Sequence, residues 1–136
     1  MTEVLFICVA NAGRSVMAEG IFNELAAGRH HAASAGSRPG TAPHAVVLEA
    51  LAEIGVDARD HVPNRLDPDE VARVDVVVST CGEEACPVTP PGTRRVYWQL
   101  PDPRGRTLDE VREIRDDIRS RVQQLLAEID ALRGGT

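Results

Sequence analysis

The chain has no lysine, so all 15 of its basic residues are arginine, and 21 acidic residues give it a formal net charge of −6. An acidic chain without a basic cluster is a poor partner for nucleic acid or for an anionic membrane surface. There is no run of about 18 consecutive apolar residues, which argues against a membrane-spanning helix. No basic leader precedes the first apolar run, and we therefore expect a cytoplasmic protein.

Aromatic residues are also rare, at 3%, and cysteine occurs at only three positions. An odd number of cysteines leaves at least one thiol free, and structural disulfides are rare in a reducing compartment. The histidines are scattered and lack the paired spacing of a zinc site, so we expect them to be surface or capping residues. The cysteines and histidines are Cys8, Cys81, Cys86, His30, His31, His44 and His61.

The length and composition are those of one ordinary globular domain. With 136 residues, 43% hydrophobic and 26% charged, the chain can bury a core, and we expect a single domain over residues 1–136. Short apolar strands alternate with amphipathic helices. This pattern predicts a three-layer α/β fold: a four-stranded, mostly parallel sheet with helices on both faces.

We expect strands over 4–7, 30–36, 74–80 and 95–99, and helices over 15–27, 44–54, 66–71 and from 107 onward. In the short third helix, Asp67 is expected as the N-cap and Pro68 at the first helical position. The last helix carries an apolar stripe that we expect to face the core: Val111, Ile114, Ile118, Val122, Leu125, Ile129 and Leu132.

The stretch from Cys8 to Ser15 joins the first predicted strand to the first predicted helix. Backbone N–H groups in such a loop point inward, and the helix dipole adds to their field, so the loop predicts an oxyanion site. The same field lowers the pKa of a thiol at Cys8. Arg14 presents a planar fork for two oxygens of a tetrahedral oxyanion. Cys8, Cys81 and Asp102 all follow predicted strands, whose ends share the edge where ligands bind in a parallel sheet.

The spacing Cys-x-x-Asn-x-x-Arg-Ser after the first strand resembles the phosphate-binding loop of the low-molecular-weight tyrosine phosphatase fold. That fold also serves the thioredoxin-coupled arsenate reductases. Cys8 is then the nucleophile, Ser15 is expected to donate its hydroxyl to the thiolate, and Asn11 to hold the loop in shape. The residues expected to bind the oxyanion are Val9, Ala10, Asn11, Ala12, Gly13, Arg14 and Ser15.

Asp102, in the sequence Leu-Pro-Asp-Pro, is the candidate general acid. Displacing oxygen from phosphate or arsenate requires a proton for the leaving group, and the flanking prolines stiffen the loop that holds the carboxyl group. A plain Asp-Pro turn is the alternative. The position between the last strand and the last helix favours catalysis, which is the role of an Asp-Pro at this place in the resembled fold.

Cys81 and Cys86 favour the reductase branch. A phosphatase needs only the loop cysteine, whereas a reductase must supply two electrons, which thiols do by passing on a disulfide. In the resembled reductases the loop cysteine bonds arsenate, a second cysteine attacks the adduct and releases arsenite, and a third moves the disulfide outward to thioredoxin. The matching residues are Cys8, Cys81 and Cys86, in that order.

Two positions depart from the pattern of the small phosphatases. Gly13 stands where they usually have a second cysteine, and Arg104 stands where they place an aromatic residue after Asp-Pro. Because an aryl phosphate needs an aromatic slot, the site predicts a small bare oxyanion, either arsenate or its mimics phosphate and sulfate. Ala10 also replaces a glycine that is usual in the reductase loop, and the segment from Cys81 to Cys86 is shorter than in the best-known members.

The resemblance further implies an external dithiol reductant, thioredoxin or a similar protein, and no bound cofactor. Some members bind potassium beside the loop through Asn, Glu, Ser and Asp. Asn11, Glu19 and Ser34 match three of these four residues, whereas Asn64 stands at the position of the acid. We expect a monomer.

Two alternative functions stay open. The first is a protein tyrosine phosphatase that uses Cys8, Arg14 and Asp102. The second is a non-catalytic oxyanion sensor with Cys81 and Cys86 as a redox switch. Asp102 argues against the sensor, because a sensor has no need of a proton donor.

Overall fold

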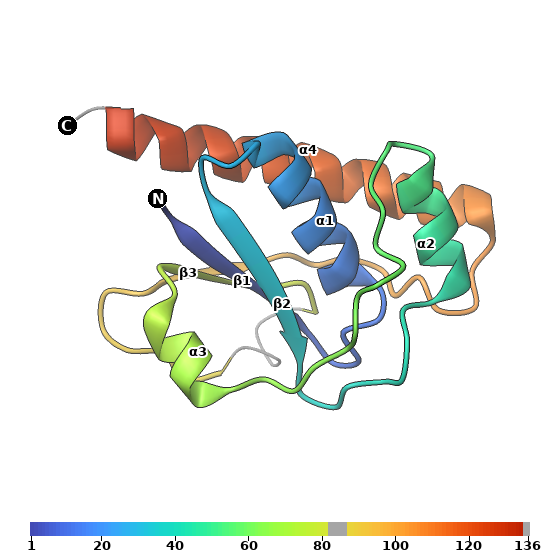
Figure 1. Ribbon diagram of the computed structural model, residues 1–136, viewed down its shortest axis with the longest axis horizontal. Helices are drawn as coiled ribbons and strands as arrows, with labels where there is room; N and C mark the ends of the chain where they lie inside the picture. Colours follow the sequence, from blue (N-terminus) through green and yellow to red (C-terminus); the bar gives the residue numbers. More distant parts are fainter. Residues whose placement is uncertain (82–86, 135–136) are drawn as a thin grey trace.

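The computed structural model describes residues 1–81 and 87–134, in which strands and helices alternate along most of the chain (Figure 1). The elements are β1 (Glu3–Cys8), α1 (Arg14–Ala26), β2 (His31–Gly36), α2 (Ala45–Ala52), α3 (Pro68–Arg73), β3 (Val76–Ser79), β4 (Arg94–Tyr97) and α4 (Leu108–Gly134). Asp67 caps α3 by accepting a hydrogen bond from the backbone N–H of Asp69, and Pro68 follows it, which confirms the predicted helix start.

The four strands form one sheet in the order β2-β1-β3-β4. All three neighbouring pairs are parallel. The predicted α/β fold with a four-stranded sheet is therefore confirmed, and every pairing is of the parallel kind. Since parallel strands end at the same edge, β1 and β3 bring the residues that follow them side by side.

Helices cover both faces of the sheet, which makes the three layers that the sequence predicts (Figure 1). Side chains alternate along β1: Val4 and Phe6 enter a large core with α1, α2 and α4, whereas Leu5 and Ile7 enter a smaller core with α3. The Phe6 ring lies 5.8 Å from that of Phe22 and 5.6 Å from that of Trp98. Three of the few aromatic residues, Phe6, Phe22 and Trp98, therefore lie in the core.

Two expectations from the sequence are wrong. Leu132 is 70% exposed, because the last turns of α4 extend beyond the sheet and the other helices (Figure 1). His30 is not a surface residue but is 6% exposed, since its Nδ1 accepts a hydrogen bond from the backbone N–H of Thr2 and its Nε2 lies 2.8 Å from Asp130 Oδ1. Within the described ranges, no helix is both long and apolar enough to cross a membrane.

Gly36, at the end of β2, lies against the loop after β1. A Cβ atom at this position would lie 2.5 Å from the carbonyl oxygen of Val9 and 3.0 Å from the nitrogen of Asn11. We expect Gly36→Ala to lower the free energy of unfolding by about 1–3 kcal/mol, because backbone atoms must move apart. Urea unfolding measures the change.

Gly40→Ala is the matched control. Its Cβ would meet nothing closer than the carbonyl oxygen of Ala10 at 3.8 Å, an ordinary contact. This variant should stay within about 0.5 kcal/mol of the parent chain. An equal loss of stability in the two variants would contradict the close approach of β2 to the loop.

Candidate active site

The loop between β1 and α1 is fixed by hydrogen bonds between its carbonyl groups, which point outward, and a neighbouring segment of the chain. Four of them accept hydrogen bonds from the segment 37–44: Ser37 N to Cys8 O at 3.2 Å, Arg38 N to Val9 O at 2.8 Å, Gly40 N to Ala10 O at 2.9 Å and His44 N to Ala12 O at 3.0 Å. On the other side, the N–H groups of Ala10 and Asn11 donate to the sulfur of Cys8. Asn11 adopts the left-handed conformation, with φ 52°. The loop is therefore fixed with backbone donors directed at an anion.

Cys8 and Cys81 lie side by side at the carboxyl edge of the sheet. A hydrogen bond from the thiol of Cys81 is the largest cause that lowers the pKa of Cys8. The N–H groups of Asn11 and Ala10 and the charge of Arg14 lower it further, against the opposing effect of burial. The pKa of Cys81 is raised by the same hydrogen bond and by burial. Cys8 is thus the thiolate of the pair and Cys81 the neutral thiol.

Arg14, the first residue of α1, is anchored at one end of its guanidinium group. Its Nη1 donates to the carbonyl oxygen of Leu100 at 3.0 Å. Among the residues that the structure describes, its Nε is the one buried side-chain polar atom with no hydrogen-bond partner. Such a donor costs about 1–3 kcal/mol when it stays unpaired, so the geometry favours an oxygen-bearing anion beside it.

A cavity of about 150 Å³ lies in front of the loop. Its lining residues are Cys8, Val9, Ala10, Gly13, Arg14, His44, Asp102 and Arg104. The Asp-Pro turn closes tightly over the loop, since a Cβ at Gly13 would lie 2.6 Å from the Cγ of Pro103. Asp102 Oδ1 accepts the backbone N–H of Arg104 at 3.0 Å, which orients the carboxyl group.

Most of the predicted site residues meet at this cavity. Cys8, Arg14 and Asp102 line it, and Cys81 contacts Cys8, whereas Cys86 lies outside the described residues. Ser15 is buried, and its hydroxyl accepts a hydrogen bond from Asn11 Nδ2 at 2.9 Å. Donation of this hydroxyl to the Cys8 thiolate stays a prediction.

Sequence reasoning missed His44 and His61. The first lines the cavity as the residue before α2, and its backbone N–H is bound to the loop. The second reaches Asn11 with its ring, with Nε2 3.0 Å from Asn11 Oδ1. Neither has a local sequence signal, because both are placed by partners far away along the chain.

The residues predicted to bind potassium also meet. Asn11 Nδ2 donates to Ser34 Oγ at 2.9 Å, and Ser34 Oγ donates to Glu19 Oε1 at 2.7 Å. These atoms are thus already bonded to one another. Across residues 1–81 and 87–134, no group of three or more His, Cys, Asp or Glu residues is placed to hold a metal ion.

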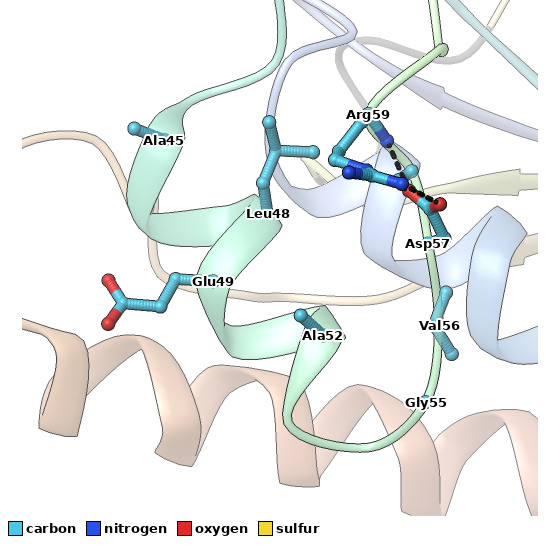
Figure 2. Close-up of a pocket in the computed structure, with 9 residues that line it drawn as sticks. Ala45, Leu48, Glu49, Ala52, Gly55, Val56, Asp57 and Arg59 are labelled. Atoms are coloured by element: carbon cyan, nitrogen blue, oxygen red, sulfur yellow. Dashed lines mark hydrogen bonds and ion pairs between the residues drawn. The ribbon is translucent and has the colours of Figure 1, made fainter.

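A second cavity, larger than the first, lies away from Cys8 and Cys81, between α2 and the segment 55–59 (Figure 2). It measures about 580 Å³ and is lined by Ala45, Leu48, Glu49, Ala52, Gly55, Val56, Asp57, Ala58 and Arg59. An ion pair joins two of its own residues, Arg59 and Asp57, at 2.8 Å. The lining residues include no cysteine, serine or threonine, whereas the small cavity contains the Cys8 thiolate, so we place the chemistry in the small cavity.

A thiolate at the mouth of an anion-binding loop, with an arginine and a carboxyl group beside it, defines a thiol enzyme that acts on oxyanions. Residues 3–133 match the family described as low molecular weight phosphotyrosine protein phosphatase. The chain belongs to this family.

Similar proteins within this fold include arsenate reductases. Arsenate reductase 1 of Staphylococcus haemolyticus is 34% identical over 124 residues, which are 89% of this chain and 92% of that protein. A structure of an arsenate reductase in the phosphate-binding state is 34% identical, with a TM-score of 0.79 and 95% of this chain and 99% of that chain covered. The thioredoxin-dependent arsenate reductase of Corynebacterium glutamicum is 34% identical, with a TM-score of 0.81. The match covers 96% of this chain but only 62% of that longer chain.

The hydrogen bond from the Cys81 thiol predicts how the pKa of Cys8 changes when Cys81 is replaced. Replacing the donor, Cys81→Ala, should raise the pKa of Cys8 by at least about one unit, because the thiolate loses its strongest partner. Alkylation by iodoacetamide as a function of pH, followed at Cys8 by peptide mass spectrometry, gives the midpoint.

Cys81→Ser is the matched variant, since a hydroxyl can still donate to the thiolate. Its midpoint should lie nearer to that of the parent chain. Identical midpoints in the parent, Ala and Ser chains would show that Cys81 does not stabilise the thiolate.

Proposed function

We propose that this protein reduces arsenate to arsenite through a disulfide relay that starts at Cys8. The proposal rests on one observation: the free thiol of Cys81 is hydrogen-bonded to the Cys8 thiolate, next to an anion-binding loop. A phosphatase needs only the thiolate, whereas a second thiol in contact with it allows the two cysteines to form a disulfide and so supply the two electrons of a reduction. The similarity to arsenate reductases supports the same activity.

In the proposed first step the Cys8 thiolate attacks the arsenic atom, and an oxygen leaves as water. Asp102, which lines the cavity, provides the proton. The N–H groups of the loop and the guanidinium of Arg14 stabilise the negative charge on the other oxygens. Ser15 keeps Asn11 in place within the loop.

In the second step the sulfur of Cys81 attacks the sulfur of Cys8, and the S–As bond breaks. Arsenic takes up the electron pair of the S–As bond and leaves as arsenite, which accepts the proton that the Cys81 thiol releases. The two cysteines become one disulfide, so two electrons balance the change from As(V) to As(III). Cys86 then attacks Cys81, which frees Cys8 and leaves a Cys81–Cys86 disulfide. Thioredoxin or a similar dithiol protein reduces it.

The cavity wall favours a small bare oxyanion over an aryl phosphate. Among the residues that the structure describes, no Phe, Tyr or Trp lines the cavity, and the position after Pro103 is occupied by Arg104. Trp98 is buried in the core. Because phosphate and arsenate share their geometry, Cys8, Arg14 and Asp102 also support phosphatase activity, which we propose as a weak side reaction. We further propose that the chain forms a single domain over residues 1–136, which its length and composition support, and that it acts as a monomer in the cytoplasm.

The relay predicts a trapped disulfide in Cys86→Ser. After one turnover with arsenate this variant should stall with a Cys8–Cys81 disulfide, since Cys8 is only 5% exposed and an external dithiol cannot reach it easily. Peptide mapping under non-reducing conditions identifies the bond, and the parent chain under the same conditions should complete many turnovers. Many turnovers of Cys86→Ser with thioredoxin would rule out the three-cysteine relay.

A further inference from the structure

The side chain of Asn11 is fully buried, and both its oxygen and its nitrogen make hydrogen bonds. Its Oδ1 accepts the backbone N–H of Asn64 at 3.1 Å, and its Nδ2 lies 2.9 Å from the hydroxyls of both Ser15 and Ser34. A backbone N–H can only donate, so it fixes which amide atom of Asn11 is the oxygen. The ring nitrogen Nε2 of His61, 3.0 Å from the same oxygen, must therefore carry a hydrogen.

These hydrogen bonds use the oxygen lone pairs that would have to coordinate the potassium ion bound by some relatives of this fold. A monovalent cation needs oxygen lone pairs directed at it, as carbonyl oxygens provide in potassium channels. Here Asn11 Oδ1 receives three N–H groups, from His61 Nε2 and from both nitrogens of Asn64, the side-chain Nδ2 at 3.2 Å. The hydroxyl hydrogen of Ser34 is used on Glu19. The residues present do not fit the ion.

We propose that His61 and Asn64 replace the ion, and that His61 is a positioning residue for the oxyanion loop. Their N–H groups hold the side chain of Asn11, and this stabilises its left-handed backbone conformation. In that conformation the N–H of Asn11 donates to the Cys8 thiolate. The loop is then organised without a monovalent cation.

The segment that carries His61 is itself anchored. Gly36, at the end of β2, donates its N–H to Asn64 O at 2.9 Å and accepts the N–H of Leu66, also at 2.9 Å. The side chain of His61 is 12% exposed, and its second ring nitrogen lies 4.0 Å from Glu19 Oε2. The ring is therefore confined between the loop and α1, as a positioning residue must be.

The first test compares cations on the unmodified protein. At constant ionic strength, the unfolding temperature and the affinity for inorganic phosphate should be equal in potassium, sodium and choline chloride. A cation that binds the folded state would raise the unfolding temperature as its concentration rises. A rise of either quantity that is specific for potassium would overturn the proposal.

The second test uses His61→Ala, His61→Gln and, as a matched control, His31→Ala. His31 also pairs with a carboxylate, Glu3 at 2.9 Å, but lies on the surface. In calorimetry with phosphate, His61→Ala should weaken binding by about tenfold, the factor that corresponds to one lost hydrogen bond. His61→Gln keeps an N–H donor and should restore most of the affinity, while His31→Ala should bind as the parent does.

A purely structural role of His61 would lower the unfolding temperature of His61→Ala and leave its phosphate affinity unchanged, and this result would overturn the proposal. So would a His61→Gln chain that binds phosphate no better than His61→Ala. The proposal rests on oxyanion binding by the loop and not on arsenate reduction. A chain that binds phosphate but reduces no arsenate would therefore refute the reductase function alone.

Discussion

The hydrogen bond from the Cys81 thiol to the Cys8 thiolate is the interaction on which the site depends. It exists because β1 and β3 are parallel neighbours in the sheet, with Ile7 opposite Ser79, so that the residues just past both strands meet. The bond assigns different protonation states to two identical side chains. One becomes the nucleophile and the other waits as a thiol within reach of it, which is the order that a reduction requires.

The loop around Cys8 is organised from two sides. Backbone N–H groups of the segment 37–44 bind its carbonyl groups, and the side chain of Asn11 ties it to Ser34, His61 and Asn64. As a result the N–H groups of the loop face the sulfur before any substrate arrives. Preorganised donors of this kind stabilise developing charge without paying for reorganisation during the reaction. Arg14 completes the set with an unpaired buried Nε.

The sequence predicted the parts of this protein that depend on local pattern. The parallel sheet, the loop and the cap at Asp67 follow from strand composition, spacing and N-cap chemistry. Residues placed by distant partners were not predictable. His61 bonds Asn11, 50 positions away, and His30 bonds Asp130, 100 positions away. Leu132 continues a helical stripe past the end of the surface that buries it, which periodicity alone does not reveal.

The most direct test of the reductase function is a coupled assay. Arsenate-dependent oxidation of NADPH would be measured with thioredoxin and thioredoxin reductase, beside hydrolysis of para-nitrophenyl phosphate without them. We expect rapid NADPH oxidation that disappears in Cys81→Ser and in Cys86→Ser, with slow hydrolysis in the parent chain. Fast hydrolysis that requires Cys8 but is unaffected by the loss of either other cysteine, without arsenate-dependent NADPH oxidation, would contradict the account and make the protein a phosphatase.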